Sequence, residues 1–232
     1  MKAFLLAAGQ GTRLRPITET IPKCLVPICG TPMLRIWMDV CRNAGIDEVM
    51  INLHTHADIV RNWLNSNSDG IRVRLAEEPT LLGSAGTLLA NRDWVASDSS
   101  FWILYADVLT NTSLSRMRDF HFVHRPAATL ALYQVPEPTR CGIVSFDQHM
   151  VVREFVEKPA HPKSNWAFSG LMIGTPELLN HIPPRCPVDL GFDVLPQLGG
   201  QMLAYPISDY LIDIGTLDNY QKAQNTWPGL AT

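Results

Sequence analysis

A regular alternation between strand-like and helix-like segments limits how this chain can fold more than any other feature. Apolar runs at 3–8 and 49–53 are typical of buried strands. Between them, Thr31 and Pro32 provide an N-cap and a first-turn proline for a helix that stops at Gly45. A second helix is expected through 59–64, strands at 71–76 and 101–105, and a helix at 87–94. This order predicts an α/β fold with a Rossmann-like, mostly parallel sheet and helices on both faces.

After about residue 127 the pattern becomes richer in strands. Strands are expected at 128–135, 142–146, 152–156 and 168–173, with short helices at 177–181 and 192–198 and a longer one at 217–224. Hydrophobic residues make up 46% of the chain and charged residues 18%, which is typical of a globular protein, and no linker or repeat interrupts it. We therefore expect a single domain over 1–232, with a first half at 1–125 and a strand-rich second half at 126–232.

Charge, apolar runs and cysteines exclude several classes of protein. The formal net charge of −3 argues against nucleic acid as a partner, because proteins that bind it usually carry a basic excess. The run at 3–8 is broken by Gly9 and Gly11 and is too short for a signal peptide or a membrane span. Five scattered cysteines without a C-x-x-C pair favour a reduced, cytoplasmic protein without structural zinc. Neither a membrane nor nucleic acid is expected as a partner.

The loop after the first expected strand carries the first candidate site. Gly9 and Gly11 allow backbone N–H groups to approach an anion, and Arg13 adds a fixed positive charge. A lone G-x-G is more often an ordinary turn. A dinucleotide-binding loop would need a third glycine where Leu14 stands, and a P-loop would need a Gly-Lys dipeptide, which this chain lacks.

The whole string from Ala7 to Thr18, followed by Pro22-Lys23, resembles the signature of the sugar-1-phosphate nucleotidyltransferases. Four further segments resemble motifs of that family and occur in the family's order: Leu82-Gly83-Ser84-Ala85-Gly86, Ala106-Asp107, Glu157-Lys158-Pro159 and Asp213-Ile214-Gly215-Thr216. The resemblance implies an enzyme that transfers a nucleotidyl group from an NTP to a sugar 1-phosphate and releases pyrophosphate. It also implies that 1–125 binds the nucleotide and 126–232 the sugar phosphate.

The resemblance assigns a role to each matching residue. The nucleotide-binding set is Ala8, Gly9, Gly11, Thr12, Arg13, Glu78, Gly83 and Ser84. The sugar-phosphate set is Gly142, Glu157, Lys158, Asn165 and Gly170, and the catalytic set is Arg13, Lys23, Asp107, Lys158 and Asp213. Two aspartates that each follow an apolar strand, next to substrate phosphates, fit a Mg²⁺ site that keeps several waters. Residues 1–42 hold six basic and two acidic side chains, as two polyanionic substrates require.

Glu78 bears on the choice of base. Its carboxylate accepts hydrogen bonds only, and guanine offers two adjacent donors, whereas uracil and thymine offer one donor between two acceptors. The segment Phe155-Val156-Glu157-Lys158-Pro159 also resembles the form found in mannose-1-phosphate guanylyltransferases. We expect GTP with mannose 1-phosphate or a related hexose or heptose 1-phosphate.

Several alternatives stay open. UTP, dTTP, CTP or ATP could be the nucleotide, and a homo-oligomer is possible. A non-catalytic subunit that senses nucleotide-sugars would be expected to lack metal or phosphate residues, which this chain keeps. A glycosyltransferase would want an Asp-x-Asp, but Leu109 stands two residues after Asp107.

Overall fold

The computed structural model describes residues 1–67 and 70–230 and divides the chain into two compact units. Unit 1 comprises Met1–Leu81, Leu104–Leu114 and Asp209–Thr232, and unit 2 comprises Leu82–Ile103 and Ser115–Ser208. The two units are therefore interleaved in sequence, whereas the predicted halves, 1–125 and 126–232, are continuous. A single domain over 1–232 stays a prediction.

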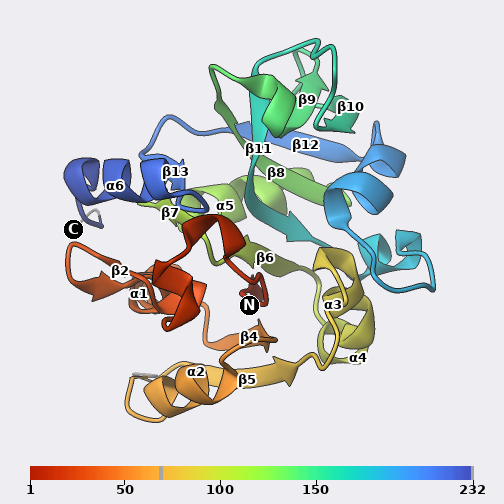
Figure 1. The fold of residues 1–232 in the computed structure, drawn as a ribbon. Helices are drawn as coiled ribbons and strands as arrows, with labels where there is room; N and C mark the ends of the chain where they lie inside the picture. Colours follow the sequence, from red (N-terminus) through yellow and green to blue (C-terminus); the bar gives the residue numbers. More distant parts are fainter. Residues whose placement is uncertain (68–69, 231–232) are drawn as a thin grey trace. The chain divides into compact units, whose positions relative to one another are not determined.

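Unit 1 is built on three parallel strands in the order β1 (Lys2–Leu6), β4 (Glu48–Leu53), β5 (Arg72–Glu77) (Figure 1). Its helices are α1 (Met33–Asn43), α2 (Ala57–Leu64) and α6 (Leu217–Thr226). β1 is apolar because it is covered: Ala3, Phe4 and Leu5 have no exposed surface. The predicted strand–helix–strand alternation is confirmed here.

The start of α1 differs from the prediction. Thr31 and Pro32 form the short strand β3 (Thr31–Pro32), which pairs antiparallel with β2 (Pro27–Ile28) through a turn at Cys29 and Gly30. Both turn residues have positive φ. Thr31 is therefore part of a hairpin and not the N-cap, and Pro32 precedes the helix without a side-chain cap.

Unit 1 also contains a two-stranded antiparallel ladder of β7 (Val108–Thr110) and β13 (Leu211–Asp213). β6 (Phe101–Tyr105), the buried strand that carries the chain from unit 2 into unit 1, comes just before β7. In this ladder Asp213 lies opposite Val108, and the Ile214 amide donates to the Asp107 carbonyl at 3.0 Å. The ladder thus joins two segments more than a hundred residues apart in sequence.

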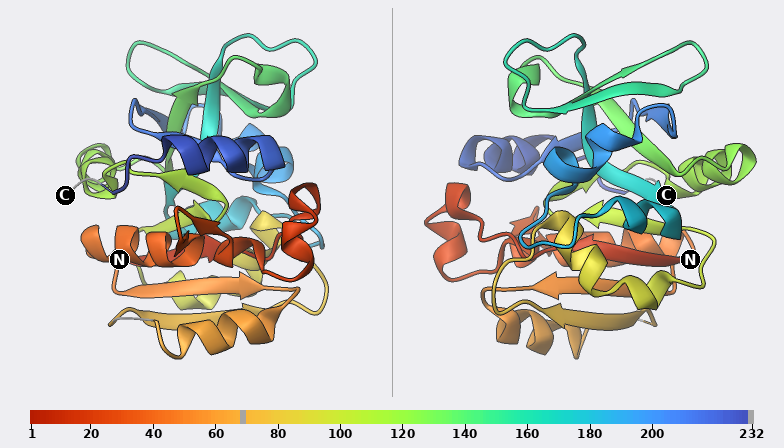
Figure 2. Two further views of the ribbon diagram at one scale, coloured as in Figure 1. Left: turned by 60° about the vertical axis from the view of Figure 1, so that its left-hand side comes forward. Right: turned by 90° about the vertical axis from the view of Figure 1, so that its right-hand side faces the viewer.

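Unit 2 holds a mixed sheet in the order β10 (Val152–Glu157), β9 (Gly142–Phe146), β11 (Trp166–Gly174), β8 (Ala128–Gln134), β12 (Met202–Pro206). Its pairs are antiparallel except β8 with β12, which is parallel. β9 and β10 lie at the opposite end of this unit from the helices α3 (Ser84–Ala90) and α4 (Arg92–Val95) (Figures 1 and 2). The α/β class with its strand-rich second half is confirmed.

The helices of unit 2 differ in detail from the prediction. The segment expected as one helix at 87–94 is two helices separated at Asn91, whose side chain donates to the Thr87 carbonyl. The expected short helices are the 3₁₀ turn η5 (Pro176–His181), the π turn η6 (Leu190–Val194) and the 3₁₀ turn η7 (Leu195–Leu198). α5 (Leu114–His124) was not predicted. Among the described residues, no helix has the length and apolar character needed to cross a membrane.

Candidate active site

The loop after β1 carries the predicted phosphate-binding residues of unit 1. Gly11 has φ of 63°, and its carbonyl accepts from the Thr18 hydroxyl at 2.7 Å. A Cβ at Gly11 would lie 2.9 Å from Thr18 Cγ2, so a side chain there would meet both backbone strain and a clash. Gly9, Thr12 and Arg13 are all exposed along the same loop, where a ligand can reach them.

Four predicted catalytic side chains of unit 1 converge around Gly215. The Lys23 ammonium lies 2.5 Å from Asp107 Oδ2, and the Gly215 amide donates to Asp213 Oδ1 at 2.5 Å. A Cβ at Gly215 would lie within 3.2 Å of Asp213 Oδ1, Arg13 Nη2 and Lys23 Nζ. Gly215 is absent from the predicted site residues, although the motif that contains it was recognised. Its missing side chain is what lets two cations and a carboxylate approach one another.

The two aspartates interact electrostatically. Loss of hydration within the surrounding protein raises the pKa of the Asp213 carboxyl, and the nearby Asp107 carboxylate raises it further. Lys23, the Gly215 amide and Arg13 oppose these effects and lower it. A pair of carboxylates close enough to repel each other is a donor set that a divalent cation would stabilise. Among residues 1–67 and 70–230, no third His, Cys, Asp or Glu completes a cluster, so such an ion would need water or substrate oxygens.

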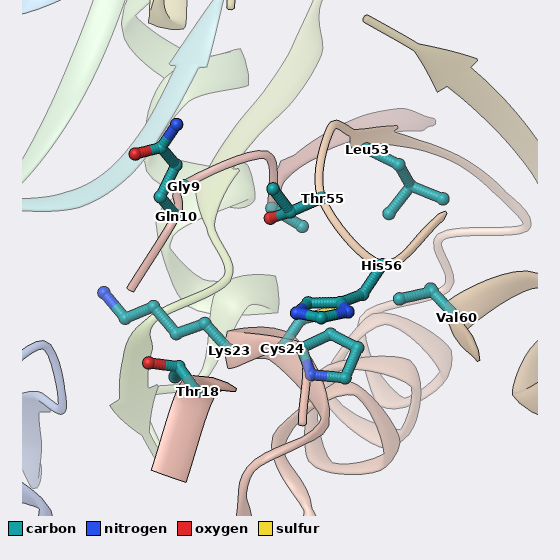
Figure 3. A pocket seen from close by; sticks show the side chains of 11 residues that line it. Gly9, Gln10, Thr18, Lys23, Cys24, Leu53, Thr55, His56 and Val60 are labelled. Atoms are coloured by element: carbon teal, nitrogen blue, oxygen red, sulfur yellow. The ribbon is translucent and has the colours of Figure 1, made fainter. Parts of the chain in front are cut away.

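A small pocket lies beside the β1 loop in unit 1 (Figure 3). Its walls come from the loop itself, from the segment that carries Thr18 and Lys23, and from the turn after β4, where Thr55 and His56 lie. His56 has φ of 58° and precedes the first turn of α2. Thr55 and His56 could not be predicted as lining residues, because only the folded chain brings their turn next to the β1 loop.

Glu78 is buried in unit 1, with 5% of its surface exposed. Its Oε1 accepts from the Asn52 side-chain amide at 2.9 Å, and Asn52 Oδ1 accepts from the Ala7 and Ala8 amides. Asn52 was not predicted as a site residue. A base-reading role for Glu78 stays a prediction.

In unit 2, Glu157 is held between two glycines. A Cβ at Gly142 would lie 2.6 Å from Glu157 Oε2, and one at Gly191 would lie 2.5 Å from the same oxygen. Burial raises the pKa of Glu157, Lys158 lowers it and Asp189 raises it. Gly191 was not predicted, since nothing in its local sequence indicates that a carboxylate distant in sequence packs on it.

Lys158 is more open than Lys23. Its ammonium is 3.8 Å from Glu157 Oε1 and 5.5 Å from the centre of the Phe192 ring, a cation–π distance. The ring itself is 58% exposed. Lys158 also has a positive φ of 49°, and its amide donates to the Cys141 carbonyl at 2.9 Å. The structure thus brings Gly142, Glu157 and Lys158 together, as predicted residues of one site in unit 2.

The other predicted residues of unit 2 have contacts of their own. Gly83 packs against Val188, whose carbonyl would lie 2.3 Å from an added Cβ, and Ser84 Oγ donates to Asp189 Oδ2 at 2.9 Å. Asn165 is exposed, and Gly170, with φ of 82°, lies where the β11–β8 register shifts. These contacts explain why the fold uses these residues, and their ligand roles stay predictions.

Comparison with known proteins decides the family. A family model described as nucleotidyl transferase matches residues 2–228. The chain belongs to the nucleotidyl transferase family. The resemblance found in its motifs is thereby confirmed, and so is the fold that it implied.

Individual relatives agree. The chain is 32% identical over 221 residues to the mannose-1-phosphate guanylyltransferase catalytic subunit beta of Xenopus tropicalis, covering 93% of this chain and 61% of the relative. It therefore spans about three fifths of the length of that relative. It superposes on HddC from Yersinia pseudotuberculosis with a TM-score of 0.82 at 25% identity, covering 97% of this chain and 98% of HddC. A putative glucose-1-phosphate thymidylyltransferase from Bacillus anthracis gives 0.88 at 24% identity, covering 97% and 94%, and shares the fold.

Proposed function

We propose that this protein transfers a nucleotidyl group from an NTP to a sugar 1-phosphate and releases pyrophosphate. The observation that carries the proposal is the convergence of Arg13, Lys23, Asp107 and Asp213 around Gly215. Two cations and two carboxylates in one cluster suit a polyphosphate that arrives with a divalent cation. Mannose 1-phosphate guanylyltransferase activity in the relative from Xenopus tropicalis, which its name states, supports the same reaction class.

In the proposed reaction, an oxygen of the sugar 1-phosphate attacks the α-phosphorus of the NTP. The new P–O bond forms as the bond between the α-phosphorus and the bridging oxygen breaks, and pyrophosphate carries away the electron pair. No covalent enzyme intermediate is needed, so the side chains orient the reactants and balance developing charge. Gly9, Gly11, Thr12 and Arg13 hold the triphosphate, with Arg13 on the leaving pyrophosphate, and Lys23 reaches the α-phosphate or the sugar phosphate.

Asp107 and Asp213 are the residues that would hold Mg²⁺. When bound, the ion would neutralise charge on the phosphate oxygens. Lys23, which pairs with Asp107, is the cation of this cluster that would face a substrate phosphate. In unit 2, Lys158 binds the sugar phosphate and Glu157 accepts hydrogen bonds from sugar hydroxyls.

We propose GTP as the nucleotide and mannose 1-phosphate, or a related hexose or heptose 1-phosphate, as the acceptor. The acceptor-only carboxylate of Glu78 and the similarity to a mannose-1-phosphate guanylyltransferase support this choice. A cytoplasmic location and assembly into homo-oligomers are likewise expectations that accompany the proposal.

The direct test is pyrophosphate release from GTP, UTP, dTTP, CTP and ATP, each combined with a panel of sugar 1-phosphates and Mg²⁺. We expect release only when both substrates and the ion are present, fastest with GTP. Binding of nucleotide-sugar without release from any pair would refute the enzymatic proposal and favour a sensing role.

A further inference from the structure

A buried asparagine joins the start of the β1 loop to Glu78. Asn52 lies near the end of β4, is 5% exposed, and pairs with Leu6 as the last step of the parallel β1–β4 ladder. Beyond that pair, the Asn52 side chain, and not the backbone of β4, accepts hydrogen bonds from the segment that follows β1. Asn52 Oδ1 accepts from the Ala7 amide at 2.6 Å and from the Ala8 amide at 3.3 Å. The two peptides at which β1 becomes the loop are therefore fixed by one side chain.

The other half of the same amide group faces Glu78. Asn52 Nδ2 donates to Glu78 Oε1 at 2.9 Å, while the Glu78 amide donates to the Leu53 carbonyl at 2.8 Å. His54 Nδ1 lies 2.7 Å from the Glu78 carbonyl oxygen. A side-chain amide can accept from two backbone N–H groups through its oxygen and donate to a carboxylate through its nitrogen at once. Aspartate lacks the donor, and leucine lacks both.

We propose that Asn52 is a positioning residue for the nucleotide: it sets the backbone at Ala7 and Ala8 from which Gly9, Gly11 and Arg13 extend, and Glu78 acts on this loop through it. The kinetic part of this inference rests on the proposed function. We expect a large effect on the loop because Asn52 is buried, with 5% of its surface exposed. If one of its hydrogen bonds is broken, no water molecule can replace the lost partner. The loop would then leave the geometry that holds the triphosphate.

A set of five variants tests the oxygen and the nitrogen of the Asn52 side chain separately. Glu78→Gln keeps an oxygen for Asn52 Nδ2 but removes the carboxylate proposed to read guanine, so we expect kcat/KM for GTP to fall while the Ala7 and Ala8 amides stay held. This variant is the reference for the double variant. Asn52→Asp keeps the acceptor for Ala7 and Ala8 but sets two carboxylates against each other. We expect it to raise KM for every NTP and lower kcat/KM by about 10–100-fold, the size of one lost buried hydrogen bond to a charged group.

The double variant Asn52→Asp/Glu78→Gln reverses the sense of the hydrogen bond, because the glutamine introduced at position 78 would now donate to the aspartate introduced at position 52. It should recover kcat/KM to within about threefold of Glu78→Gln alone, whereas Asn52→Leu should not be rescued by Glu78→Gln. KM for the sugar 1-phosphate should stay constant in all five. Thr129→Val is the matched control, since it removes another buried hydrogen bond, to His121, in unit 2.

Amide hydrogen exchange without any substrate gives a readout besides activity. In wild type the Ala7 and Ala8 amides should exchange slowly, and Asn52→Leu should speed them at least about tenfold while the Leu5 amide inside β1 stays protected. Asn52→Asp should keep most of the protection. Unchanged exchange in Asn52→Leu, or a double variant no better than Asn52→Asp, would overturn the inference. A wild type that releases no pyrophosphate would instead refute the proposed function, and the exchange data would still decide the role of Asn52.

Discussion

The lysine of the unit 1 site is largely buried in an ion pair, whereas the lysine of the unit 2 site is exposed. Lys23 is 11% exposed and lies 2.5 Å from Asp107, while Lys158 is 56% exposed and lies 3.8 Å from Glu157. In unit 1, Lys23 is paired with Asp107, and Asp213 accepts from the Gly215 amide, before any ligand arrives. In unit 2 the lysine is held by a cation–π contact with an exposed ring and by one distant carboxylate.

This contrast corresponds to the two kinds of substrate that we propose. A triphosphate with its metal ion is the same for every NTP, so a rigid, preorganised cluster suits it and gives the larger effect on rate. Sugars differ in their hydroxyls, and a site with one exposed cation and one half-buried carboxylate can be altered without disturbing the core. Changes in unit 1 should therefore affect turnover, and changes in unit 2 the affinity for the sugar phosphate.

The largest effect is expected at the aspartates. Asp107→Asn and Asp213→Asn should each lower kcat by about 10²–10³-fold in saturating Mg²⁺, because a charge that stabilises the transition state is lost. The thermal unfolding temperature should change little, so that unfolding does not account for the lost rate. Asp209→Asn, at an exposed acid of unit 1, is the control. Near-normal turnover in either site variant would remove the metal site from the account.

Arg13→Ala should come next. It should slow turnover by about 10–10²-fold for every NTP alike, because a guanidinium on the shared triphosphate ignores the base. Initial rates with each NTP measure this, with Arg42→Ala as a control for loss of an exposed arginine on α1. A penalty confined to one nucleotide would place Arg13 at the base instead.

Gly191→Ala tests whether a change in unit 2 affects the affinity for the sugar phosphate and not turnover. The added methyl would lie 2.5 Å from Glu157 Oε2 and 3.0 Å from its Cδ, so the carboxylate must move. We expect KM for the sugar 1-phosphate to rise about tenfold, the equivalent of one hydrogen bond, with little change in KM for the NTP. Gly174→Ala is the control, since the nearest atom to its methyl would be the flexible end of Leu178, at 3.3 Å, and the others lie at 3.8 Å. An equal rise in both KM values would mean that Glu157 serves both substrates.

The last prediction concerns stability in unit 2, away from the site, and leaves turnover unchanged. Burial lowers the pKa of His121 to about 4, and its Nδ1 lies 2.9 Å from Thr129 Oγ1. Between about pH 6.5 and pH 4, His121 is protonated in the unfolded chain but stays neutral in the folded chain. The free energy of unfolding should therefore fall as pH drops, by at most about 1.4 kcal/mol per pH unit from this group.

Urea unfolding at several pH values measures the slope. His121→Asn, which keeps a polar atom near Thr129 but does not titrate, should show a shallower dependence in that window. The same slope in both proteins would assign the acid sensitivity to carboxylates elsewhere.

Strands and motifs were predictable because their signals are local. The apolar run of β1 and the strand before Asp107 follow directly from burial of consecutive residues. α5 was missed because its apolar residues do not form one stripe: Leu114 and Met117 are buried, whereas Phe122 is 41% and Val123 76% exposed. The Thr31 cap failed because the hairpin with β2 depends on a turn geometry that competes with helix initiation.

The residues of the site that stand in sequence motifs were also predictable. Arg13, Lys23, Asp107 and Asp213 each carry a motif, and the fold brings them together. Asp213 was expected to follow a buried strand like that before Asp107, but it ends β13, which pairs antiparallel with β7. Gly215 lies in a recognised motif but was not named as a site residue. Asn52 and Gly191 matter only through what they touch, and a single sequence gives no sign of such contacts.

Calorimetry of Lys158→Ala tests the division between the two units most directly. GTP with Mg²⁺ and mannose 1-phosphate should each be titrated separately into wild type and variant. The account predicts an unchanged Kd for GTP and a Kd for the sugar phosphate raised by about 10–10²-fold, the value of one hydrogen bond to a charged group. Weakened GTP binding with an unchanged Kd for mannose 1-phosphate would contradict it.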